Sequence, residues 1–272
     1  DEWLTDRLTD DAIDFIERNK QQPFLVNLHY YAPHRPTVPR DKDSFQKFMG
    51  KAADSITGQG ENNREEIAGY ATMIASIDEN VKRIFDYLDQ EGLRENTIVI
   101  FTSDNGFNGL QSGTNILRGA KGTIYEGGLR VPAFVNWKGH VAPGVSETPI
   151  CGMDYFPTFL ELAQVKDYDG KLDGKSLLPL FKNNAFKERA LFWHVASTYK
   201  NPPCSIIRKD QWKLIQYLND GKVELYNLEK DLKEAHNLVE YNSEIASQLL
   251  NELITWRKNN KVPLPQASVL PF

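Results

Sequence analysis

The sequence has little of several features that would assign a chain of 272 residues to a particular protein class. Its two cysteines, Cys151 and Cys204, lie far apart and form no C-x-x-C motif, so they indicate neither a metal site nor a redox compartment. No apolar run approaches the ~20 residues that a membrane helix needs. The net charge is −5, without a basic stripe. The sequence therefore argues against a membrane-spanning protein and against nucleic acid as a partner.

What the chain does contain is an ordinary globular composition, with 40% hydrophobic and 25% charged residues. Residues 24–31 and 97–102 are continuous apolar runs bounded by turn residues, which predicts strands buried on both faces. Residues 41–63 are polar and contain Gly58 and Gly60, which predicts a surface loop or lid.

A long helix is predicted between that loop and the strand at 97–102, because apolar residues recur there at spacings of three and four. They are Ile67, Tyr70, Ile74, Ile77, Val81, Ile84 and Leu88. A helix followed by a buried strand is half of a βαβ unit, so an α/β fold with a mainly parallel sheet is expected. Shorter helices are predicted at 8–20 and 154–163, and another strand at 131–137.

After about Lys182 the pattern changes to short strand candidates separated by Pro, Asn and Gly. The turn Asn219-Asp220-Gly221 predicts a hairpin, and an apolar face predicts a final helix near residues 245–256. We therefore predict two domains, with an α/β domain at 1–182 and a small antiparallel-sheet subdomain at 183–272.

The residues best placed for chemistry follow the strand predicted at 97–102. Asp104 and Asn105 are adjacent oxygen donors at its carboxyl end, where they suit a hard divalent cation. Lys121 lies in a glycine-rich loop that could approach a sulfate or phosphate oxygen. An Asx turn without metal and a solvated loop lysine are the alternatives at these positions.

Two histidines are further candidates. His34, within Ala-Pro-His-Arg-Pro, could contact an anion or protonate a leaving alkoxide, or it could be a loop histidine without a role. His194, at the end of a predicted strand, could contact substrate or cap the edge of the sheet. The segment from Cys204 to Arg208 has the first and last residues of a C-x-P-S/A-R motif but lacks its Pro and the following Ser or Ala. We interpret that likeness as coincidence.

Many segments of the chain, taken in order, resemble the type I sulfatase family of the alkaline-phosphatase-like superfamily. They include TIVIFTSDNG at 97–106, KGTIYEGGLRVP at 121–132, DYFPT at 154–158, DGKSL at 173–177 and ELYNL at 224–228. The resemblance implies a large α/β sheet with a small C-terminal antiparallel sheet. It also implies that Asp104 and Asn105 are calcium ligands, that Lys121 binds the sulfate, and that His34 contacts the sulfate and assists the departing alcohol.

The same resemblance implies a formylglycine nucleophile, made from the cysteine of a C-x-P-S/A-R motif, and an early Asp-Asp pair that binds the metal. This sequence lacks the motif, and we assign no such metal-binding pair in it. We therefore expect the chain to be the C-terminal portion of a Ca²⁺-dependent sulfatase, inactive alone and able to associate with an N-terminal half. A sulfated small molecule or glycan is the expected substrate, and an exported or periplasmic bacterial protein the expected setting. The alternatives are a phosphatase or phosphonate hydrolase of the same superfamily and a non-catalytic glycan-binding remnant.

Overall fold

The computed structural model describes residues 2–55, 61–107, 117–182, 184, 186–196 and 200–265. Contacts divide these residues into two compact units. Unit 1 contains residues 2–100 and 136–139, and unit 2 contains residues 101–107, 117–135 and most of the chain from 140 onward. The domain boundary predicted near residue 182 stays a prediction. The two units are defined by contacts alone, and the division between them passes through the strands at 99–102 and 133–136.

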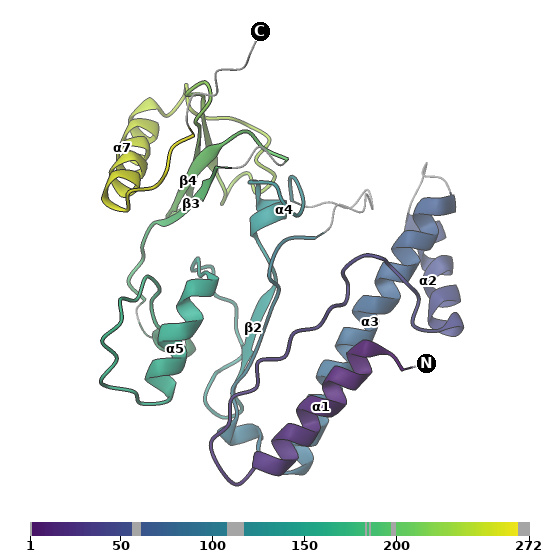
Figure 1. Cartoon of the computed structure of the whole chain (residues 1–272). Coiled ribbons are helices and arrows are strands. Elements are labelled where there is room, and N and C mark those ends of the chain that lie inside the picture. The colour runs from purple at the N-terminus through teal and green to yellow at the C-terminus, as the bar shows by residue number, and fades with distance from the viewer. Residues whose placement is uncertain are drawn as a thin grey trace. The chain divides into compact units, whose positions relative to one another are not determined.

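Unit 1 is built mainly from helices that lie along one another (Figure 1). They are α1 (Leu4–Asn19), α2 (Lys42–Ser55) and α3 (Glu61–Gln90), followed by a short 3-10 turn (Arg94–Asn96). The long helix predicted from apolar spacing is confirmed, and Gly92, with φ of +67°, follows its end.

The face that α3 buries differs from the predicted stripe. Ile77 is buried, but Ile74 is 43% exposed. Leu88 at the end of the stripe is buried as well, and so are small and polar residues beside the stripe: Ala68, Thr72, Ser76 and Asn80. The reason is polar packing against α1 and the residue before it. Trp3 Nε1 donates to Ser76 Oγ at 3.1 Å, and Asn80 Nδ2 donates to Asp6 Oδ1 in α1 at 2.6 Å.

Two sequence predictions within unit 1 are wrong. The predicted loop at 41–63 contains α2, whose first turn is capped by Asp41, since Asp41 Oδ1 accepts from the Ser44 amide at 2.7 Å. Gly58 and Gly60 of that prediction lie outside the described residues. Residues 24–31 form no strand, because no described segment pairs with them, and Leu25 and Tyr31 are 69% and 72% exposed.

The strand predicted at 97–102 is present as β1 (Val99–Thr102), and it pairs with β2 (Ala133–Asn136). Its first residues are half-buried and Thr102 is exposed, so burial on both faces is not observed within this chain. Phe101 and Phe134 stack across the pair, with ring centroids 5.1 Å apart. In the described part of the chain, β1 and β2 form a sheet of two strands, and no third strand pairs with either of them.

The C-terminal part of unit 2 is a four-stranded antiparallel sheet in the order β3-β4-β5-β6. The strands are β3 (Leu191–Val195), β4 (Cys204–Lys209), β5 (Trp212–Tyr217) and β6 (Val223–Asn227). The predicted hairpin joins β5 to β6, with the Tyr217 amide donating to the Lys222 carbonyl at 2.9 Å. The final helix is confirmed as α7 (Ser243–Asn259). The shorter helices of this unit are α4 (Glu126–Leu129), α5 (Tyr155–Leu162) and α6 (Leu178–Phe181).

The two faces of this sheet are covered by different parts of the chain. One face carries Ile207, Leu214 and Leu225, which pack against Leu249 and Leu253 of α7. Burial of such a side chain stabilises the fold by about 1.5–3 kcal/mol. The opposite face packs against Ile124 and its neighbours, a cluster that also contains Cys204, Ile206, Ile215, Tyr217, Tyr226 and Leu228. Figure 1 shows α7 on one side of the strands and α4 on the other.

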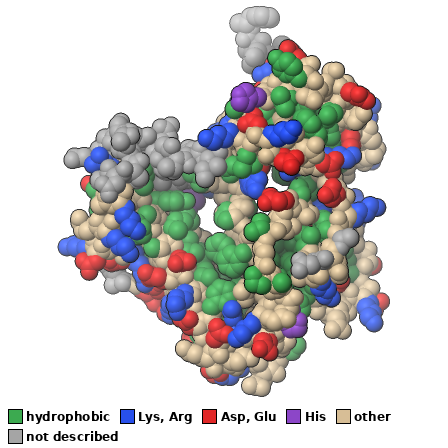
Figure 2. Space-filling model, turned by 180° about the vertical axis from the view of Figure 1, so that it is seen from behind, with side chains coloured by type: hydrophobic (Ala, Val, Ile, Leu, Met, Phe, Trp, Pro, Cys, Tyr) green, Lys and Arg blue, Asp and Glu red, His purple; other side chains and the backbone are tan. Residues whose placement is uncertain are grey.

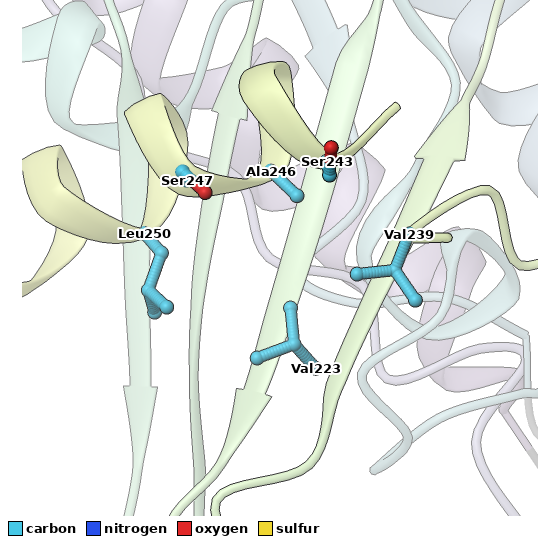
Figure 3. A pocket seen from close by; sticks show the side chains of 6 residues that line it. All are labelled: Val223, Val239, Ser243, Ala246, Ser247 and Leu250. Atoms are coloured by element: carbon cyan, nitrogen blue, oxygen red, sulfur yellow. The ribbon is translucent and has the colours of Figure 1, made fainter. Parts of the chain in front are cut away.

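A small hollow opens between α7 and the end of the sheet (Figure 3). Its lining is mostly apolar and comes from Val223, Val239, Ser243, Ala246, Ser247 and Leu250. None of these side chains titrates or binds metal strongly, so the hollow offers no catalytic group. None of the helices in the described ranges is long and apolar enough to cross a bilayer.

Candidate functional site

The loop that carries Asp104 and Asn105 packs against the glycine pair inside α4, Gly127 and Gly128. The Gly106 amide donates to the Gly128 carbonyl at 3.1 Å. The approach is so close that a Cβ at Gly106 would lie 1.9 Å from the Gly127 carbonyl oxygen. Only glycine fits such a contact without moving the backbone. The sequence Asp104-Asn105-Gly106 thus folds as a turn whose position depends on residues 127–128.

The lysine of the candidate site is linked to the same loop. The Lys121 amide donates to the Phe107 carbonyl at 2.7 Å. Gly122, with φ of +85°, follows the lysine in a left-handed backbone conformation that favours glycine. Asp104, Asn105 and Lys121 therefore lie on adjoining loops of unit 2, and the site roles predicted for them stay predictions.

Asn201, which the sequence patterns did not predict, binds the backbone of the residues that follow Lys121. Asn201 Nδ2 donates to the Gly122 carbonyl at 2.7 Å, and Asn201 Oδ1 accepts from the Ile124 amide at 3.3 Å. Lys200 Nζ also donates to the Lys121 carbonyl at 2.8 Å. No local pattern predicts this contact, because 79 residues separate Asn201 from Gly122.

The oxygen donors of the first loop are accessible. Asp104 is exposed and Asn105 is half-buried, and the side-chain Nδ2 of Asn105 donates to Asp104 Oδ1. These two side chains fit part of the ligand set of a hard cation, which takes six to eight oxygens in the case of Ca²⁺. Within the described ranges, no group of three or more His, Cys, Asp or Glu side chains is gathered to hold a metal. The cation role thus stays a prediction that needs further ligands.

His34 belongs to unit 1, so its predicted convergence with Lys121 and Asp104 stays a prediction. The residue is exposed, and its amide donates to the Tyr31 carbonyl at 2.9 Å. Its Nδ1 lies 2.8 Å from the Arg35 carbonyl oxygen, which can only accept, so Nδ1 carries the proton. In the neutral ring Nε2 is then an acceptor, and His34 can donate from Nε2 only as the imidazolium.

His194 lies on the face of the sheet that α7 covers, opposite the face that packs against Ile124. Its Nδ1 is 2.9 Å from Ser205 Oγ, its neighbour on β4. Burial lowers the pKa of His194, and the charge of Arg257 lowers it further, while the backbone of Pro263 acts in the opposite direction. This setting favours a role within the sheet, and the substrate contact predicted for His194 stays untested.

Because its pKa is lower in the folded protein, His194 is expected to make the protein less stable in acid. The neutral ring is favoured above the unfolded pKa of about 6.5, and that contribution is lost as the pH falls through the lower folded value. The melting temperature of His194→Gln should therefore fall less than that of the wild type between pH 7 and pH 5. Equal pH dependence of the two proteins would contradict this expectation.

Cys204 is not a nucleophile in this structure. It is fully buried in β4, where burial raises the pKa of its thiol to about 11. A thiol with so high a pKa is almost fully protonated at neutral pH, and the thiolate is the reactive form. The likeness of residues 204–208 to a sulfatase nucleophile motif is therefore coincidental, as expected.

The close packing at Gly106 leads to a prediction. Gly106→Ala should displace the Asp104 loop, because the new methyl group would overlap the Gly127 carbonyl. We expect a loss of about 1–3 kcal/mol in unfolding free energy together with weaker cation binding. Gly144→Ala is the matched control, since a Cβ there meets no atom within 4 Å. Equal denaturation midpoints and cation affinities for the two variants would show that the contact at Gly106 does not hold the loop.

The surface charge agrees with the sequence composition. Figure 2 shows basic and acidic side chains interspersed over the face in view. Among the residues described there, neither sign forms a continuous field of the kind that binds a nucleic-acid backbone.

Comparison with known proteins identifies the family. The family model described as Sulfatase matches residues 1–165, and the model described as N-sulphoglucosamine sulphohydrolase, C-terminal, matches residues 120–259. The chain is 28% identical to the uncharacterized sulfatase YdeN of Escherichia coli K12, over 99% of this chain and 53% of that protein. It is 32% identical to a sulfatase of Formosa agariphila, over 96% of this chain and 51% of the relative.

A solved structure gives the same result for the fold. Ps i-CgsB, also solved in complex with k-i-k-neocarrahexaose, matches with a TM-score of 0.77 and 29% identity. The match covers 94% of this chain and 55% of Ps i-CgsB. The chain thus spans about half the length of YdeN, of the Formosa sulfatase and of Ps i-CgsB, and it carries part of an alkaline-phosphatase-like fold. Because the Sulfatase model matches more than half of the residues of this chain, the chain belongs to the sulfatase family.

Proposed function

We propose that the full-length protein that contains this chain hydrolyses the sulfate esters of a carbohydrate in a Ca²⁺-dependent reaction. The observation that carries the proposal is the link between two loops of unit 2. The loop with the oxygen donors Asp104 and Asn105 is joined to the Lys121 loop by the 2.7 Å hydrogen bond from the Lys121 amide to the Phe107 carbonyl. Oxygen donors beside a cationic side chain suit a divalent cation and the anion that it binds.

Each residue has a distinct role in this proposal. Asp104 and Asn105 would hold the cation, which when bound neutralises charge on the sulfate oxygens. The Lys121 ammonium contacts one sulfate oxygen as a point charge, with the backbone of Lys121 held by Phe107 and Lys200. His34, as the imidazolium, donates a proton from Nε2 to the departing alkoxide. We assign the nucleophile to no residue of this chain.

A carbohydrate substrate is supported by the relative that was solved with a bound sugar, Ps i-CgsB. The two bacterial relatives support a bacterial origin, and export from the cell is a further part of the proposal. We also propose that residues 1–272 act together with an N-terminal half of the family pattern, since the chain spans about half of each relative.

The test is hydrolysis by the purified full-length protein. We expect turnover of an aryl sulfate and of a sulfated oligosaccharide, loss of turnover on chelation, and recovery with added Ca²⁺. The polypeptide of residues 1–272 alone should be inactive. Faster hydrolysis of a matched phosphate or phosphonate ester would favour the related hydrolases of the superfamily. Binding of the sulfated sugar without any hydrolysis would favour a glycan-binding remnant, and either result would overturn the proposal.

A further inference from the structure

A buried charge network lies beneath the loops of the candidate site. Lys213 on β5 is 1% exposed, and its Nζ lies 2.9 Å from Glu126 Oε1 and 2.8 Å from Glu234 Oε1. Glu234 is fully buried and Glu126 is 8% exposed. Removing charges from water costs free energy unless the partners are well placed. Such a network therefore needs an explanation beyond the stability of the sheet.

Glu234 holds both ends of the loop that carries Lys121. At the loop's end, Glu234 Oε2 accepts from the Glu126 amide at 2.7 Å. At its start, the Glu234 carbonyl accepts from Arg118 Nη1 at 2.7 Å. The loop also closes on itself, because the Gly127 amide donates to the Arg118 carbonyl at 2.7 Å.

Two tyrosines also hold Arg118, and together with the contacts of Glu234 they form a clamp on the loop from Arg118 to Glu126. The guanidinium lies over the Tyr125 ring, with Cζ 3.7 Å from the ring centroid, and Nη1 donates to Tyr226 OH at 3.1 Å. Arg118 is thus fixed in orientation between the loop and β6. The clamp leaves Lys121 between two fixed points, so few conformations are open to its backbone.

The loop with the oxygen donors depends on the same clamp. Gly106 packs on Gly127 and Gly128, the residues directly after Glu126. A shift of Glu126 would therefore move the surface that Gly106 contacts, and with it Asp104 and Asn105. The chain of contacts runs from Glu234 to Glu126, then to Gly127 and Gly128, and then to Gly106.

We propose that Glu234 and Lys213 are positioning residues, which hold the Asp104 and Lys121 loops in the geometry that binds the cation and the anion. This inference rests on the proposed function, and it adds two residues that contact neither ligand. Burial raises the pKa of the Glu234 carboxyl, whereas Lys213 and the Glu126 amide favour its ionised form. The geometry of the three charged groups is consistent with a fixed support.

The test compares two glutamate variants in the full-length protein. Glu234→Gln removes one buried charge while keeping an oxygen that can accept from the Glu126 amide. Glu252→Gln is the matched control, because it removes a glutamate charge from an ion pair that is exposed. Glu252 on α7 pairs with Lys209 on β4 at 2.7 Å, and both side chains are about 40% exposed. For Glu234→Gln we expect the half-saturating Ca²⁺ concentration and the KM for an aryl sulfate to rise about 10- to 100-fold. The value of kcat at saturating Ca²⁺ should change only a few-fold, and the control should match the wild type.

Amide hydrogen exchange gives a readout that does not depend on catalysis. In Glu234→Gln the amides of Gly106 and Lys121 should exchange about tenfold faster, while the amide of Ile207 in β4 exchanges as in the wild type. If the wild type hydrolyses no sulfate ester, the proposed function fails and the exchange result alone decides the positioning role. Unchanged exchange at Gly106 and Lys121 would overturn it. Lys213→Arg, which keeps the charge, should restore most of the protection lost in Lys213→Met.

Discussion

Asp104→Asn in the full-length protein is expected to lower the rate of Ca²⁺-dependent sulfate ester hydrolysis strongly. The substitution keeps the size of an exposed side chain and removes the one anionic donor of the Asp104-Asn105 pair. A divalent cation loses an anionic ligand, and the rate at fixed Ca²⁺ should fall about 10³-fold, the scale for losing a strong electrostatic stabiliser of the transition state. Excess Ca²⁺ should recover part of the rate, because the remaining ligands are unchanged.

Isothermal titration with Ca²⁺ measures the binding part of this prediction directly. Asp173→Asn is a suitable control, because Asp173 is an exposed carboxylate in the same unit that pairs only loosely with Lys171, at 3.5 Å. Wild-type affinity and rate in Asp104→Asn would show that residues 103–106 form an Asx turn without metal.

Lys121→Met is expected to lower kcat/KM for an aryl sulfate about 10²- to 10³-fold, which corresponds to about 2.7–4 kcal/mol of transition-state stabilisation. The methionine keeps most of the aliphatic length and removes the ammonium. The backbone contacts of residue 121 to Phe107 and Lys200 do not involve the replaced atoms, so the loop should keep its fold.

The cation dependence separates this variant from Asp104→Asn. In Lys121→Met the half-saturating Ca²⁺ concentration should stay at the wild-type value while the rate falls. Lys171→Met, at a side chain 82% exposed in the same unit, is the control. A wild-type rate in Lys121→Met would make residue 121 a solvated loop lysine, the alternative that its sequence context leaves open.

Local patterns in the sequence predicted those elements whose contacts are close in the chain. The hairpin at Asn219–Gly221 and the helix α7 each follow from a turn motif or an apolar repeat within one segment. The turn after β1 and the glycine-rich loop of Lys121 were also visible within about twenty residues of sequence, but the hydrogen bond that links them was not predicted. In contrast, the wrong strand at residues 24–31 shows that an apolar run does not reveal whether a partner strand exists.

The network of Lys213, Glu126 and Glu234 was missed because Glu126 is 87 residues from Lys213 and 108 residues from Glu234 in the sequence. A signal was present in β5, where Lys213 occupies the same alternating face as Ile215 and Tyr217. A lysine on a buried face of a strand requires an acidic partner. The sequence cannot say which of its 37 acidic residues supplies it.

The distance in sequence between Glu126 and Glu234 also bears on the order of events during synthesis. Domains emerge from the ribosome from the N-terminus at about 5–20 residues per second, so residues 104–126 appear many seconds before Glu234. The amide of Glu126 meets its partner carboxylate only after β5, β6 and the following turn have been made. A premature stop between residues 127 and 233 would thus deprive the Lys121 loop of its anchor while leaving every residue of that loop in the translated product.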